Sequence, residues 1–200
     1  MISDTVPAPD LQAAADATAV AQRVVDSGIA ALRVAGGPDH AQVLAYDVSH
    51  AAAAVRTAES VVAYGAHGDT EARIACAFVA DALAELAARI VGRSADWGVT
   101  ADWMAPAEQF VANYRHPEFL GSLAEVQGDR HLDADFELVR DTFHRFAADQ
   151  IRPRAEHIHR GNTDIPEEII TGMAEMGGFG MSVPEEYGGF AAEGDRKSVV

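Results

Sequence analysis

The 200-residue chain has 31 acidic and 15 basic residues and a formal net charge of −16, and acidic residues outnumber basic ones in both halves. This balance disfavours nucleic-acid and anionic-membrane partners, because both need clustered Lys and Arg. Hydrophobic residues make up 48% of the chain, which is typical of a globular protein with a sizeable core.

Alanine-rich sequence with helical periodicity fills residues 1–93 and predicts three helices joined by short glycine turns, an antiparallel bundle. The first helix begins after a cap at Asp10 and ends at Gly36-Gly37, the second spans Asp39 to Tyr64, and the third runs from Asp69 to Gly92. The apolar positions expected on their inner faces are Leu11, Ala15, Val25, Ile29 and Leu32, then Val43, Leu44, Val48, Ala51, Val55 and Val62, then Ile74, Phe78, Ala82, Leu86 and Ile90.

Residues 94–132 form a less regular, aromatic-rich connector. Its aromatic residues are Trp97, Trp103, Phe110, Tyr114 and Phe119, and Pro106 and Pro117 interrupt it. The segment is either a loose connector or a piece that packs onto the helices. So many aromatic side chains argue against a free linker.

Residues 133–200 are also predicted to be helical, which makes the whole fold all-α. An apolar stripe of Phe136, Val139, Phe143, Phe146 and Ala147 marks one helix, which Pro153 must kink or stop. Asp164, followed by Pro166 and Glu167, predicts the capped start of a second helix. Ile169, Ile170, Met173 and Met176 line that helix, and Gly177-Gly178 ends it.

Few residues are candidates for chemistry. His40, Asp47 and His50 have a spacing that allows a metal or haem site, but a polar helix face is the favoured interpretation because no second ligand pair accompanies them. His157 and His159 point apart on a helix. Cys76 lies among alanines as a core residue, and Glu185-Glu186 are expected to be solvated loop carboxylates. We therefore assign no catalytic, cofactor-binding or metal-ligating residue.

The single cysteine excludes an internal disulfide framework and fits a reducing cytosol. The chain has no run of eighteen apolar residues, and its first residues lack the basic start of a signal peptide. These features predict a cytoplasmic protein with no membrane partner.

From residue 133 the sequence resembles the amino-terminal helical domain of the acyl-CoA dehydrogenases. The resemblance rests on FELVRDTFHRFAADQIRPRAEHI, followed by DIPEEIITGMAEMGGFGMSVPEEYGGF, with the Pro-Glu-Glu-Tyr-Gly-Gly turn at Pro184–Gly189. In this family the domain continues into further helices, a β-domain that grips the flavin, and a carboxy-terminal bundle that follows it. The catalytic glutamate and main flavin contacts lie in those later parts. Tyr187 is expected to be a packed aromatic.

The resemblance implies FAD, an acyl-CoA substrate, an electron-transfer partner and a homo-oligomer for a full-length member, with no flavin held by this chain alone. Residues 1–93 are an unusual helical extension. The stretch YDVSHAAAAVRTAESVVAYGAHGDTEARIACAFVADALAELAARI is similar to part of the extension in a branch resembling methylsuccinyl-CoA dehydrogenase.

The last residues, from Asp195, continue no pattern of that family, and Lys197 is the only lysine beside 14 arginines. A truncated or frame-shifted gene product explains both facts, and a native short protein is the rival. The sequence thus predicts the amino-terminal portion of a flavin-dependent acyl-CoA dehydrogenase, inactive by itself. The alternative is a stand-alone helical module that binds a partner protein.

Overall fold

The computed structural model describes residues 6–124 and 126–190, so the expectations about the tail from Asp195 lie outside the described residues. The chain divides into two compact units, Met1–His131 and Leu132–Val200. Helices and turns account for the structured parts of both, and the described residues contain no β-strand. The all-α prediction is confirmed.

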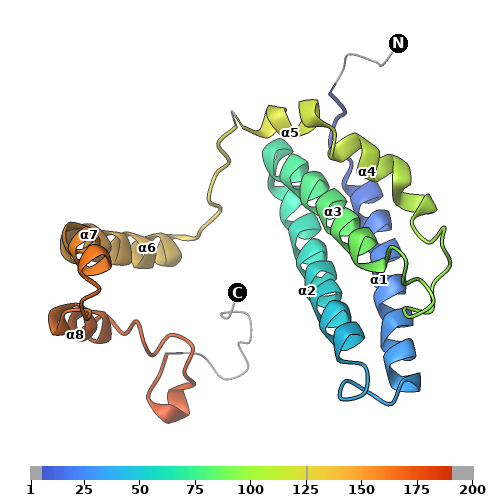
Figure 1. Ribbon diagram of the computed structural model, residues 1–200. Helices are drawn as coiled ribbons and strands as arrows, with labels where there is room; N and C mark the ends of the chain where they lie inside the picture. The colour runs from blue at the N-terminus through green and yellow to red at the C-terminus, as the bar shows by residue number, and fades with distance from the viewer. Residues whose placement is uncertain (1–5, 125, 191–200) are drawn as a thin grey trace. The chain divides into compact units, whose positions relative to one another are not determined.

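Three long helices build the amino-terminal unit: α1 (Leu11–Val34), α2 (Gln42–Tyr64) and α3 (Asp69–Ile90). Each of the three contacts the other two, and they run antiparallel in chain order (Figure 1). Glycines end them as predicted. Gly36 and Gly92 adopt φ angles of 90° and 74°, a left-handed conformation that glycine reaches at little cost.

Small side chains dominate the core between these helices. Its buried members include Ala14, Ala17, Val20, Ala21, Val24, Val25, Leu44, Val48, Ala51, Val55, Ala58, Ala75, Cys76, Val79, Ala80, Leu83, Leu86 and Ile90. Two predicted core positions are wrong, because Val43 is 68% exposed and Ile74 is 42% exposed. The predicted row on α3 advances four residues per step, and each such step turns about 40° around a helix of 3.6 residues per turn. The row therefore starts on the surface at Ile74 and enters the core only toward Leu86 and Ile90.

The cap at Asp10 forms as predicted, since its Oδ1 accepts a hydrogen bond of 2.9 Å from the backbone N–H of Ala13. We expect Asp10→Ala to lower the free energy of unfolding of this unit by about 1 kcal/mol, because that N–H loses its partner. Urea unfolding followed by circular dichroism measures the change. Asp16→Ala is the matched control, because Asp16 accepts only an exposed side-chain bond from Gln12. Equal losses in the two variants would contradict the capping role.

Residues 94–131 belong to the same compact unit as the three helices, so the separation at residue 93 does not describe the packing. They include α4 (Glu108–Tyr114) and α5 (Pro117–Leu123), both of which contact α3. Trp97 and Phe119 are fully buried in the core. The Ser27 hydroxyl on α1 also donates a 2.8 Å hydrogen bond to the carbonyl of Gly98. Of the two alternatives for this segment, packing onto the helices is the one observed.

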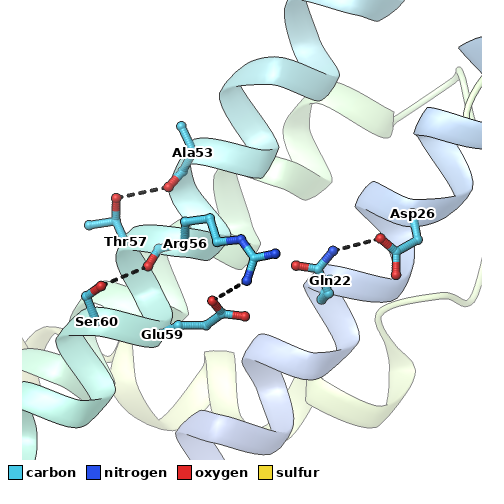
Figure 2. Close-up of polar contacts among 7 residues, drawn as sticks. All are labelled: Gln22, Asp26, Ala53, Arg56, Thr57, Glu59 and Ser60. Carbon is cyan, nitrogen blue, oxygen red and sulfur yellow. Dashed lines mark hydrogen bonds and ion pairs between the residues drawn. The ribbon is translucent and has the colours of Figure 1, made fainter. Parts of the chain in front are cut away.

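Four side-chain contacts of α1 and α2 stay within a single helix. Figure 2 shows Gln22 donating to Asp26 on α1, and Arg56 donating to Glu59 on α2. The hydroxyls of Thr57 and Ser60 donate to carbonyls one turn earlier in α2. None of the contacts drawn links the two helices, so here α1 and α2 are held together by their apolar faces.

The carboxy-terminal unit contains α6 (Ala134–Phe146), α7 (Arg152–Gly161) and α8 (Glu167–Glu175). A π-helical turn at Ala147–Ile151 joins α6 to α7. Pro153 follows it in the first turn of α7, where its missing N–H costs least. The proline thus ends the regular α-helix at Phe146 while the chain continues helically beyond it.

The predicted cap of α8 at Asp164 is wrong. The N-cap residue is Pro166, which makes no side-chain cap bond, and Glu167 is the first helical residue. Proline prefers φ near −65° and cannot donate, so here it stands immediately before the helix, and the N-cap lies two residues past Asp164. Asp164 therefore carries no expected capping energy.

Candidate functional site

The three residues of the possible metal site do not come together. Asp47 accepts hydrogen bonds from Arg89 at 2.9 Å and from Arg93 at 2.6 Å, one on each carboxylate oxygen. The His50 ring packs against Tyr46 at 4.4 Å between centroids, and His40 lies beside Gly36. Over residues 6–124 and 126–190, no group of three His, Cys, Asp or Glu side chains has a metal-binding arrangement.

Asp47 instead forms a partly buried ion-pair cluster that ties α2 to the end of α3. Its side chain is 11% exposed, and those of Arg89 and Arg93 are 32% and 31% exposed. Burial raises the pKa of Asp47, but the hydrogen bonds and charges of Arg93 and Arg89 outweigh it and hold that pKa below its ordinary value. A charged residue at this position of an otherwise apolar face is the one sequence signal for such a pair.

A second polar cluster surrounds Glu71 in the first turn of α3. Glu71 is buried, and its Oε1 lies 2.8 Å from Nε2 of His131. The His67 ring stacks on His131 at 4.5 Å between centroids, and Tyr64 meets His131 edge-on. The hydrogen bond from His131 holds the pKa of Glu71 below its ordinary value. Sequence reasoning missed this cluster, because sixty positions separate its two main members.

Cys76 is fully buried, as predicted for a core residue. Its Sγ lies 3.6 Å from the carbonyl oxygen of Asp10, and burial raises the pKa of the thiol. A protonated thiol is a poor nucleophile. Nearby, Tyr114 donates a 2.8 Å hydrogen bond to the carbonyl of Ala8, and burial raises its pKa to about 12. Both contacts fasten the start of α1 to the rest of the unit.

The carboxy-terminal unit presents an apolar hollow with a volume of about 510 Å³. Its lining comes mainly from α7 and α8 and includes Ile151, Ala155, Ile158, Ile169, Met173 and Phe179. His159 is also in the lining, while His157 is not, in line with two residues that point apart. The hollow offers a surface for apolar contact and few groups that could orient a polar ligand.

Other apolar side chains among the described residues of this unit are exposed as well. Phe136 on α6 is 62% exposed, Phe179 is 62% exposed, and no described residue of α6 or α7 is buried. Tyr187 is 75% exposed, so the expectation of a packed aromatic is wrong within the described chain. Both adjacent glutamates, Glu185 and Glu186, are exposed as expected.

The backbone explains why glycine occupies both positions after Tyr187. Gly188 has a φ of 83°, in the region that favours glycine. A Cβ on Gly189 would overlap the carbonyl oxygen of Val183. The N–H of Gly189 also donates to the carbonyl of Pro184 at 3.2 Å. The Pro184–Gly189 turn therefore sets the chain's direction through its backbone.

Comparison with known proteins matches residues 133–198 to the family described as acyl-CoA dehydrogenase, N-terminal domain. A 63-residue stretch, 32% of the chain, is 46% identical to (2S)-methylsuccinyl-CoA dehydrogenase of Cereibacter sphaeroides. A 57-residue stretch, 28% of the chain, is 39% identical to 3-(aryl)acrylate reductase of Clostridium sporogenes.

These alignments cover only 12% and 15% of the two relatives' own lengths. The family match begins at Asp133, which is the N-cap of α6, and it spans α6, α7, α8 and the Pro184–Gly189 turn. Residues 133–198 of the chain therefore match the amino-terminal domain of the acyl-CoA dehydrogenase family.

Proposed function

We propose that this chain supplies the amino-terminal part of a flavin-dependent acyl-CoA dehydrogenase, which desaturates an acyl-CoA thioester between its α and β carbons. The family match at residues 133–198 is the observation that carries the proposal. The exposed apolar surface of α6, α7 and α8 supports it, because patches of this kind usually mark surfaces that other protein covers.

Two further parts of the proposal concern the substrate and the assembly. The relative that is 46% identical over 63 residues is named for methylsuccinyl-CoA, and the amino-terminal bundle resembles an extension in that branch, so we favour a branched dicarboxylyl thioester. FAD, the acyl-CoA and an electron-transfer partner would be bound by a full-length enzyme. We expect that enzyme to be a cytoplasmic homo-oligomer. In the described chain, no helix is long and apolar enough to cross a membrane.

The chain alone is expected to be colourless and without acyl-CoA-dependent reduction of an artificial electron acceptor. Desaturation needs a positioned carboxylate base and a flavin held against the β-carbon. A flavin needs a pocket that buries most of its rings with a few placed polar groups, and His159 is the one polar side chain among the described residues that line the apolar hollow on α7 and α8. Absorbance after gel filtration and a dye-reduction assay measure both. Retained flavin, or turnover with a short acyl-CoA, would contradict this expectation.

A chimaera tests the proposal itself. Residues 133–190 would replace the corresponding stretch of the Cereibacter methylsuccinyl-CoA dehydrogenase, and we expect the product to retain flavin and measurable turnover. The matched control carries Ile169→Asp, a charge on the one buried apolar residue of α8, and should lose both. If the unmodified chimaera folds but binds no flavin, the alternative of a stand-alone interaction module is favoured instead.

A further inference from the structure

The Glu71 carboxylate contacts the last residues of the amino-terminal unit. Glu71 is 4% exposed, and its side chain projects from α3 toward the segment after α5. Its Oε1 lies 2.8 Å from His131 Nε2, a distance typical of a charge-assisted hydrogen bond. Burying a carboxylate without a hydrogen-bond partner would be costly. This contact gives Glu71 a partner and holds His131 against the start of α3.

Two glycines leave room for this carboxylate. A Cβ on Gly128 would lie 2.9 Å from Glu71 Oε1, and a Cβ on Gly68 would lie 2.7 Å from Oε2. The carboxylate is thus enclosed on one side by the turn before α3 and on the other by the segment that carries His131. A side chain at position 128 would therefore crowd the carboxylate, so that either the Glu71 side chain or the segment around Gly128 would have to shift.

The backbone of this segment also depends on the contact. His131 has a φ of 54°, a conformation that costs a non-glycine residue energy and persists where the surroundings enforce it. Stacking of His67 on the His131 ring adds a second enforcing contact. The next residue but one, Asp133, is already fixed as the N-cap of α6, where it accepts from the N–H groups of Asp135 and Phe136.

We propose that Glu71 is a latch that fastens residues 128–131 to the helical bundle, so that Leu132 alone forms the free connection between the two units. With the latch open, the free connection lengthens to about residues 127–132. The latch is a conformational device of the bundle and does not depend on the proposed enzymatic function.

Limited trypsin digestion of the full chain tests the latch, because Arg130 precedes His131. We expect His131→Ala and Glu71→Gln to speed cleavage after Arg130 about tenfold, the effect of losing a hydrogen bond to a charged group when cleavage follows local opening. Cleavage after Arg160, in the other unit, is the internal reference and should not change. Hydrogen exchange of residues 127–132 should rise in the same variants.

If Glu71→Gln lowers the stability of the whole bundle, substitutions at two glycines still test the latch. Gly128→Ala leaves the latch residues in place but crowds the carboxylate, and it should speed cleavage after Arg130 as the other variants do. Gly121→Ala is the matched control, since a Cβ there meets nothing within 4 Å. Cleavage within about twofold of the wild-type rate in both His131→Ala and Gly128→Ala, with unchanged thermal unfolding, would overturn the latch. Equal acceleration in Gly121→Ala would also overturn it.

Discussion

Trp97→Ala is expected to lower the free energy of unfolding of the amino-terminal unit by about 4 kcal/mol, the usual cost of removing a large buried aromatic ring. Trp97 is fully buried. A Cβ on Gly28 would lie 2.8 Å from its ring and equally close to Val48. The ring therefore fits against both α1 and α2, and its loss leaves a cavity that two long helices cannot close by small shifts.

Two other substitutions sharpen this test. Trp97 Nε1 has no hydrogen-bond partner among the described residues, so Trp97→Phe removes an unsatisfied donor together with part of the ring and should cost less than about 2 kcal/mol. Trp103→Ala, at a partly buried site on the same core, should also cost less than Trp97→Ala. Urea unfolding followed by circular dichroism gives the free energy of unfolding of each of the three variants. If Trp97→Ala costs no more than Trp103→Ala, residues 94–131 are a loose connector after all.

Local signals were enough to predict the three long helices of the amino-terminal unit. Asp10 and the glycines at 36, 65 and 92 mark helix ends because their effects act within one turn of the chain. The inner faces were harder to predict. In alanine-rich helices nearly every face is apolar, so the position of Val43 or Ile74 relative to the core depends on which neighbours pack there. The cap at Asp164 failed because a proline two residues later determined the start of α8.

The polar clusters could not be predicted from spacing. Glu71 and His131 meet only because α5 leads the chain back across the start of α3. Asp47 appeared as a possible metal ligand since its partners, Arg89 and Arg93, lie more than forty positions away. The family resemblance, in contrast, could be recognised from residue 133 onward, because it depends on an ordered series of local sequence features and not on contacts between distant residues. The structure of that region exposes Phe136 and Tyr187, whose cover no described residue provides.

Asp47→Ala is expected to lower the free energy of unfolding of the amino-terminal unit by about 2 kcal/mol at neutral pH. Removing one member of a buried ion pair costs about 3–5 kcal/mol, and the exposure of Arg89 and Arg93, 32% and 31%, reduces that because water reaches the cations left behind. Asp81→Ala is the matched control. Its 2.8 Å pair with Arg115 is about half exposed on both sides and should contribute less than about 1 kcal/mol.

The pH dependence separates a charge effect from a packing effect. The pKa of Asp47 is lower in the folded protein than its ordinary value of 3.8, so the unfolded chain binds the proton more readily. The contribution of Asp47 is then fully present above the unfolded pKa, and it is lost as pH falls through the lower folded pKa. The difference in unfolding free energy between wild type and Asp47→Ala should stay constant from about pH 7 to pH 5 and shrink below about pH 4. A difference that persists unchanged into the acid range would show that Asp47 stabilises the junction of α2 and α3 by its shape and not by its charge.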